Sequence, residues 1–233
     1  MTEPLHIVAV IVFAILMVGA FALFGANFGK SKDPHATIRS MTFDAMFIAI
    51  LLLMVFVPNL GYIAITPFIS FTLLHLPVLL GAALGGPKKG VLYGLVFGIS
   101  SYMQALSSAG FNALFAFPWV AIPPRVIFGL AAGFLFSFIG KVSNRGKKSL
   151  YLSLGSAGLT MFHTVLVFVD LYIFFPNEVG GLLTSSNPVA ETTSLTFLAL
   201  IGIGMLGEMA IAAFIIPPLY LATYRLAPNK RKS

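Results

Sequence analysis

The sequence has no cysteine and very little charge. Of its 233 residues, 9% are Asp, Glu, Lys or Arg and 58% are hydrophobic, and the mean hydropathy is +0.98. Because an ordinary soluble domain is about 25% charged, this chain has too little polar surface to cover a water-soluble globule. The missing cysteines exclude disulfides, thiolate metal sites and cysteine nucleophiles. The sequence therefore predicts an integral membrane protein.

Sequence motifs for catalysis or nucleotide binding are also missing. There is no His-Glu-x-x-His and no Gly-x-Ser-x-Gly, and no cluster of metal ligands stands out. Residues 25–31 are one residue short of a phosphate-binding loop, so we do not expect the chain to bind ATP by itself. The predictions are that the protein is not an enzyme and needs no cofactor or metal.

Long, continuously apolar runs alternate with short polar segments. Barrel strands would alternate in polarity over about 10 residues, so these runs favour helices, and we expect no strands. A helix of about 20 residues crosses a bilayer, and some of these runs are shorter. We predict seven membrane spans, at residues 5–24, 42–57, 69–84, 91–106, 125–140, 150–175 and 194–220.

The basic residues predict the orientation. Thirteen of the fourteen lie in every second connection or in the C-terminal tail, including the turn at Lys88 and Lys89. Lys and Arg collect in cytoplasmic loops, which explains the net charge of +7 without a nucleic-acid partner. We therefore predict a multi-pass protein of the cell membrane with its N-terminus outside and its C-terminus in the cytoplasm. The opposite side holds one cation, Arg125.

The predicted outer connections differ from the short, basic inner turns. They cover residues 58–68, 107–124 and 176–193, and they are rich in Pro, Gly, Asn and aromatic residues. Long, apolar connections of this kind on one face suggest a lid over a cavity.

A set of short motifs resembles one family of membrane proteins. The motifs are Ala45-Met46-Phe47-Ile48-Ala49, His75-Leu76-Pro77-Val78, Gly81, Gly86-Pro87-Lys88-Lys89-Gly90, Gly94, Gly98-Ile99-Ser100, Pro124-Arg125, Gly129 and Gly133. These motifs resemble segments of the substrate-binding components (S-components) of energy-coupling-factor (ECF) transporters. The resemblance covers residues 41–227.

The resemblance implies a six-helix bundle, here residues 31–233, that binds a water-soluble vitamin from outside the cell. Such a subunit works with a transmembrane coupling protein and two ATPase subunits. It implies that Ala45 and Ala49 contact the coupling protein, and their spacing leaves a flat stripe for a second helix. The apolar run within residues 1–30 would be an extra transmembrane helix in front of this bundle.

Ionisable groups at membrane depth are costly, and each one is a candidate for function. His163 and Asp170 are seven residues apart and so lie on one helix face. Glu208 is deep in the last predicted span. These side chains either bind substrate or form internal polar contacts, and Glu208 could also pair with His163 or carry protons.

The outer end of the predicted bundle supplies the other candidates. The planar fork of Arg125 suits a carboxylate, although it could instead bind carbonyl groups of the preceding loop. Tyr102, Gln104 and Asn112 could add polar contacts, and Trp119 fits both a pocket wall and an interfacial aromatic belt.

Several other features favour structural roles. We expect His75 to satisfy a carbonyl group freed by Pro77, and Asp44 to meet Arg39 or a helix N-terminus. The pairs of glycines spaced four apart predict helix-packing faces, namely Gly81 and Gly85, Gly94 and Gly98, and Gly129 and Gly133.

Together these features predict the substrate-specific subunit of an ECF-type vitamin importer. Pantothenate is our first choice of cargo, and pyridoxine, folate, riboflavin and cobalamin stay open. The alternative is a stand-alone, proton-coupled transporter of a small organic solute, in which His163, Asp170 and Glu208 relay protons. The sequence shows no clear inverted repeat of the kind such carriers often have.

Overall fold

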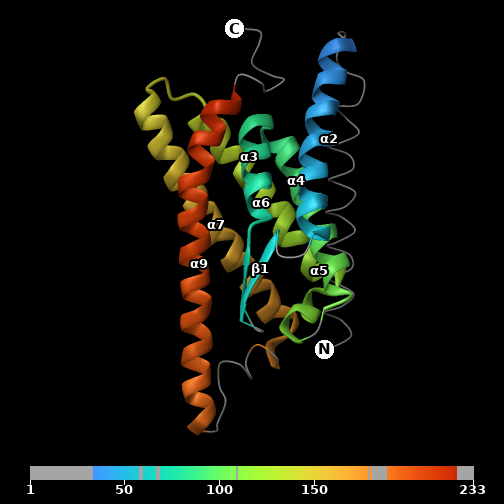
Figure 1. The fold of residues 1–233 in the computed structure, drawn as a ribbon, viewed down its shortest axis with the longest axis vertical. Coiled ribbons are helices and arrows are strands. Elements are labelled where there is room, and N and C mark those ends of the chain that lie inside the picture. Colours follow the sequence, from blue (N-terminus) through green and yellow to red (C-terminus); the bar gives the residue numbers. More distant parts are fainter. Residues whose placement is uncertain are drawn as a thin grey trace.

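The structure is a computed structural model that describes residues 34–57, 60–66, 69–108, 110–177, 179 and 188–224. Figure 1 shows long helices running side by side along one axis, with a small β-hairpin between them. The helices are α2 (Pro34–Phe56), α3 (His75–Gly85), α4 (Pro87–Ala105), α5 (Pro118–Ala121), α6 (Pro123–Ile139), α7 (Arg145–Phe174) and α9 (Pro188–Thr223), with a 3-10 helix η1 (Gly110–Phe115).

The length and composition of four segments suit membrane crossing. They are Ile38–Phe56, Pro118–Ile139, Arg145–Phe174 and Ile201–Thr223. This agrees with the predicted helical membrane protein. The predicted spans 42–57, 91–106, 125–140, 150–175 and 194–220 fall on α2, α4, α6, α7 and α9, although α2 and α9 begin eight and six residues earlier than predicted. Helix α4 is not one of the four segments. The predicted extra helix within residues 1–30 lies outside the described residues.

The predicted span 69–84 and the absence of strands were wrong. Residues Ile69–Thr72 form strand β2, which pairs antiparallel with β1 (Tyr62–Thr66), and Tyr62 is opposite Thr72. Both segments are rich in β-branched and aromatic residues, which favour strands. Helix α3 therefore has 11 residues and is roughly 16 Å long, about half the thickness of the hydrocarbon core.

Glycines bring α4 and α6 into backbone contact, as their spacing predicted. A Cβ atom added to Gly90 would overlap the carbonyl oxygen of Gly129, and one added to Gly94 would overlap that of Arg125. Gly133 similarly lies against Pro87 at the start of α4. Only glycine permits this approach, which holds the start of α6, and hence Arg125, against α4.

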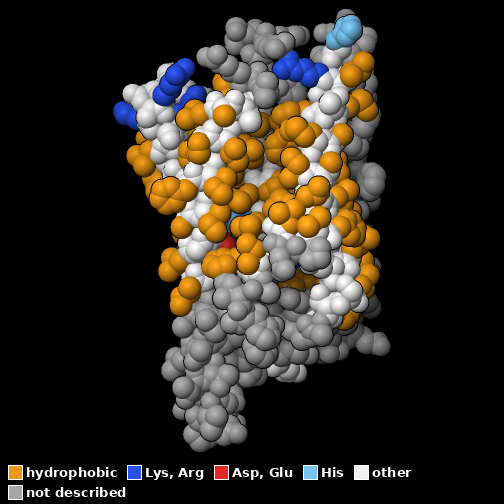
Figure 2. All heavy atoms as spheres, viewed as in Figure 1, with side chains coloured by type: hydrophobic (Ala, Val, Ile, Leu, Met, Phe, Trp, Pro, Cys, Tyr) orange, Lys and Arg blue, Asp and Glu red, His pale blue; other side chains and the backbone are white. Residues whose placement is uncertain are grey.

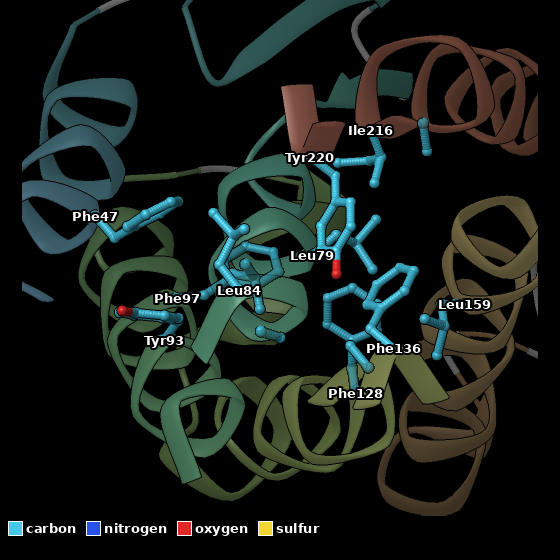
Figure 3. Packing of buried hydrophobic residues seen from close by; sticks show 14 of the residues in the cluster. Phe47, Leu79, Leu84, Tyr93, Phe97, Phe128, Phe136, Leu159, Ile216 and Tyr220 are labelled. Carbon is cyan, nitrogen blue, oxygen red and sulfur yellow. The ribbon is translucent and has the colours of Figure 1, made fainter. Parts of the chain in front are cut away.

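Aromatic side chains fill the core between the helices. Figure 3 shows Phe128 and Phe136 of α6 pointing toward Tyr220 of α9 and Leu159 of α7. Each of the two phenylalanines is at most 1% exposed. By contrast, α2 leaves much of its surface open, and large apolar side chains such as Leu53 and Phe56 are exposed on it.

Hydrogen bonds from serine join α7 to α9. Pro217 lies inside α9 and has no backbone N–H to give to the carbonyl oxygen of Ala213. The hydroxyl of Ser153 donates to that oxygen at 2.9 Å, and Ser156 donates to the carbonyl oxygen of Ala212 at 3.1 Å. In the membrane interior, a side chain that satisfies such a freed carbonyl group removes a cost of several kcal/mol.

Basic side chains gather at one end of the molecule, above a broad apolar band (Figure 2). Lys89 in the first turn of α4 forms an ion pair with Asp44 of α2, and the hydroxyl of Tyr93 donates to the same carboxylate at 2.7 Å. Of the two partners expected for Asp44, the structure thus shows a helix N-terminus, since Lys89 is in the first turn of α4, and this ion pair is not with Arg39. In the short turn between α3 and α4, Gly86 adopts a φ of +82°, which favours glycine.

Candidate functional site

Arg125 is a buried cation in the first turn of α6. It is 5% exposed, and Nη1 donates to the carbonyl oxygen of Val120 at 3.3 Å. Its Nε has no hydrogen-bond partner among the described residues. The guanidinium carbon is 4.7 Å from the ring centre of Phe115 and 5.8 Å from that of Phe97. Arg125 therefore binds a carbonyl group of the preceding loop, which was one of the two roles considered from the sequence. This hydrogen bond uses only part of the guanidinium fork.

His163 also contacts the ring of Phe97. Its ring centre is 5.5 Å from that of Phe97 and 4.9 Å from that of Phe128, and the residue is 7% exposed. Nε2 is buried and has no hydrogen-bond partner among the described residues. The aromatic rings therefore position His163 of α7 close to Arg125 of α6.

Asp170 lies two turns further along α7. Its Oδ2 is buried without a hydrogen-bond partner among the described residues. The carboxylate is within electrostatic range of Arg125, but the two do not form an ion pair in the described part of the chain. Arg125, His163 and Asp170, which the sequence singled out separately, thus belong to one polar cluster.

The β-hairpin adds residues that the sequence did not reveal. The hydroxyl groups of Tyr62 in β1 and Ser101 in α4 are hydrogen-bonded at 3.0 Å. Burial is the main cause that raises the pKa of Tyr62 above its ordinary value, so the phenol stays protonated at neutral pH. Tyr62 is also within electrostatic range of Arg125. A hydroxyl pair in an apolar helix, Ser100-Ser101, was the available signal.

Glu208 of α9 contacts the hairpin rather than His163. Its Oε1 accepts a hydrogen bond from the backbone N–H of Thr72 at 2.5 Å, and the residue is 8% exposed. The neighbouring Gly207 lies against the ring of Phe71. From the sequence, Glu208 was expected either to bind substrate or to form an internal polar contact. The structure shows an internal polar contact, the hydrogen bond from Thr72.

The outer-loop candidates surround this cluster less directly. Trp119 is half-buried, with its ring 5.3 Å from that of Phe117, and it packs against the end of α7. Tyr102 packs in the apolar cluster that includes Phe115. The backbone of Gln104, and not its side chain, accepts hydrogen bonds from Ser107 and Ser108. The side chain of Asn112 lies outside the described residues.

The remaining candidates are His75, which was expected to be structural, and Ala45 and Ala49, which were expected to contact a partner. His75 is fully buried at the start of α3, beside the backbone of Thr72. Ala45 and Ala49 are both exposed on α2, where a second helix can reach them. In the described part of the chain, no group of three or more metal-ligating side chains comes together.

Comparison with known proteins decides the family. Residues 39–220 match the family model described as the ECF transporter, substrate-specific component. The chain belongs to this family. A pantothenic acid transporter of Lactococcus lactis subsp. cremoris is 29% identical over 183 residues, which cover 72% of this chain and 87% of the relative. A pantothenate transporter of Leuconostoc mesenteroides is 30% identical over 142 residues, 59% of this chain and 70% of the relative.

Family membership agrees with the predicted class of function. ECF substrate-specific components are transporter subunits rather than enzymes, and the apolar helices of this chain suit a membrane-spanning transport protein. The buried polar cluster of this ECF component lies among α4, α6 and α7, beside the β-hairpin. It is the part of the described structure in which buried polar atoms without internal partners gather around a cation.

Proposed function

We propose that the protein is the pantothenate-binding subunit of an ECF-type importer and that pantothenate binds at Arg125. The observation that carries the proposal is the buried guanidinium group of Arg125, whose Nε has no described partner. Pantothenate transporters among its relatives support the same cargo.

The side chains around Arg125 suit the functional groups of pantothenate. A carboxylate is the anion that a planar guanidinium fork binds best. Pantothenate also carries hydroxyl and amide groups. Asp170 can accept hydrogen bonds from hydroxyl groups, and the unpartnered Nε2 of His163 can donate or accept one. The rings of Phe97 and Phe115 provide apolar walls for the carbon chain between these groups.

Pantothenate suits this site better than riboflavin or cobalamin does. The cluster has a buried cation against two aromatic rings, and its other polar groups are few. A small, flexible acid can reach a charge enclosed in this way, whereas a large ring system would need a wide opening beside Arg125. The outer residues Tyr102, Gln104, Asn112 and Trp119 are proposed to line the entrance rather than to bind the carboxylate.

Transport is proposed to need a coupling protein and two ATPase subunits. The exposed Ala45 and Ala49 on α2 support a helix-packing surface for the coupling protein. The basic end of the bundle supports a cytoplasmic C-terminus and an outside N-terminus. Under this proposal, substrate enters from the end opposite the basic side chains.

The test is a competition for the purified protein, with native mass spectrometry as the readout. Pantothenate, pyridoxine, folate, riboflavin and cobalamin are mixed at equal concentration, and we expect one bound pantothenate per chain. Uptake is then measured in proteoliposomes. We expect uptake only when the coupling protein and ATPases are present with ATP. Uptake by the chain alone, driven by a pH gradient, would support the proton-coupled carrier instead.

A further inference from the structure

A polar contact joins the β-hairpin to α9. The backbone N–H of Thr72 in β2 donates to Oε1 of Glu208 at 2.5 Å, although the two residues are 136 positions apart in sequence. The ring of Phe71 packs directly on Gly207, where a Cβ atom would overlap it. A glycine and a carboxylate in adjacent positions on α9 therefore hold adjacent residues of β2.

The strand register leaves the Thr72 N–H for this contact. Leu73 donates to the carbonyl oxygen of Gly61 at 2.8 Å, and Tyr62 is the Cα partner of Thr72. In an antiparallel pair, hydrogen-bonded and non-hydrogen-bonded positions alternate, so the N–H of Thr72 points away from β1. Without Glu208, this partly buried N–H would lose its hydrogen bond.

Strand β1 reaches the Arg125 cluster through Tyr62, the residue opposite Thr72. The hydroxyl of Tyr62 is 3.0 Å from that of Ser101 in α4, and Tyr62 is within electrostatic range of both Arg125 and Glu208. The pair Tyr62–Thr72 thus links α9 on one side to α4 on the other, beside the proposed binding site. If the hairpin moves away from α9, Tyr62 moves with it.

We propose that Glu208 is a positioning residue that keeps the β1–β2 hairpin closed beside the Arg125 site and thereby slows the release of substrate. The proposal rests on the proposed function, since it assumes that pantothenate binds at Arg125. Glu208 acts through the N–H of Thr72 and does not contact the substrate. A carboxylate next to an anionic substrate would repel it, whereas a carboxylate that accepts a backbone hydrogen bond stabilises the hairpin.

The two ends of this hydrogen bond can be removed separately. Glu208→Leu removes the acceptor, and Thr72→Pro removes the donor, because proline has no N–H. Proline suits this position, since the N–H of Thr72 points away from β1 and the preceding residue is already extended. Glu208→Gln keeps an acceptor oxygen but removes the charge. Gly202→Ala on α9 is the matched control, because a Cβ atom there meets nothing within 4 Å.

The first readout is backbone hydrogen exchange over residues 60–73 without substrate. We expect exchange to be faster by about fivefold or more in Glu208→Leu and Thr72→Pro, and unchanged in Glu208→Gln and Gly202→Ala. The double variant should exchange no faster than either single variant, because both remove the same bond. Additive effects would overturn the proposal. Because this readout needs no substrate, it is independent of the identity of the cargo.

The second readout is the dissociation rate of radiolabelled pantothenate. Glu208→Leu and Thr72→Pro should each raise this rate about fivefold or more, and Glu208→Gln should restore it to the wild-type value. A dissociation rate as high in Glu208→Gln as in Glu208→Leu would show that the charge of Glu208 is needed, and would overturn the positioning role. If wild-type protein binds no pantothenate while the exchange result holds, the cargo assignment fails and the hairpin contact stands.

Discussion

The guanidinium carbon of Arg125, in the first turn of α6, lies 4.7 Å from the ring centre of Phe115 in η1. A cation over an aromatic face gains about 0.5 to 2 kcal/mol, and more when water is excluded. The contact stabilises a charge that would otherwise be costly at this depth. It also leaves the edge of the guanidinium group, including Nε, for an anionic partner.

The aromatic contact gives a first prediction. Phe115→Leu should weaken pantothenate binding by about 3- to 30-fold, since it removes the cation–π contact but keeps an apolar side chain. Phe134→Leu is the control, because Phe134 is on the same helix as Arg125 and is exposed. Equal affinities of the two variants, measured by equilibrium dialysis, would show that the ring of Phe115 does not hold Arg125 for binding.

A second prediction concerns the glycine contact between α4 and α6. Gly90→Ala should lower the free energy of unfolding by about 1 to 3 kcal/mol, because its Cβ atom would overlap the carbonyl oxygen of Gly129. Gly158→Ala in α7 is matched to it, since a Cβ atom there meets nothing within 4 Å. Thermal unfolding in detergent should show a lower Tm for the first variant only. The same Tm for both would contradict this packing.

A third prediction concerns the ion pair between α2 and α4. Asp44→Asn and Lys89→Met should each destabilise the protein, because each leaves a partly buried partner unpaired. The double variant should lose less stability than the sum of the two, by about 0.5 kcal/mol or more. Lys147→Met, at an exposed position on α7, is the control. Strict additivity in thermal unfolding would mean that the pair adds no coupling energy.

The exposed alanines of α2 give a fourth prediction. Replacing both Ala45 and Ala49 by Leu should abolish uptake by the complete complex, because larger side chains keep a second helix at a distance. Binding of pantothenate to the isolated subunit should not change. Ala210→Leu on α9 is a matched substitution at another exposed alanine. Normal uptake by the α2 variant would place the coupling surface elsewhere.

The features predicted from sequence are those that depend on local patterns. The apolar runs gave most helices, and the spacing of Gly94 with Gly98 and of Gly129 with Gly133 indicated packing faces, because small residues four apart form a flat face. The sequence did not show that these faces join α4 to α6 or that Gly90 takes part. The hairpin was missed because Ile69–Thr72 is as apolar as the helix after it. The β-branched and aromatic residues of the first strand, which Gly61 and Pro67 bound, were the better signal for a hairpin.

The charged members of the candidate site were predictable, but Tyr62, Ser101 and the contacts within the site were not. His163 and Asp170 were identified as ionisable groups in an apolar span, where a charge needs a reason, and Arg125 as the one cation on the predicted outer side. The sequence could not show that Phe97 contacts both Arg125 and His163, or that Glu208 accepts a hydrogen bond from Thr72. Such contacts join residues far apart in the chain, and only the tertiary packing brings them together.

The most direct test of the central claim is calorimetric titration of the purified protein with pantothenate, for wild type and for Arg125→Gln. The account predicts saturable binding of one pantothenate per chain to the wild type. It predicts at least about 30-fold weaker binding to Arg125→Gln, because the substrate carboxylate would lose its charged, buried partner. Equal affinity of the two proteins, with both correctly folded by thermal unfolding, would contradict it.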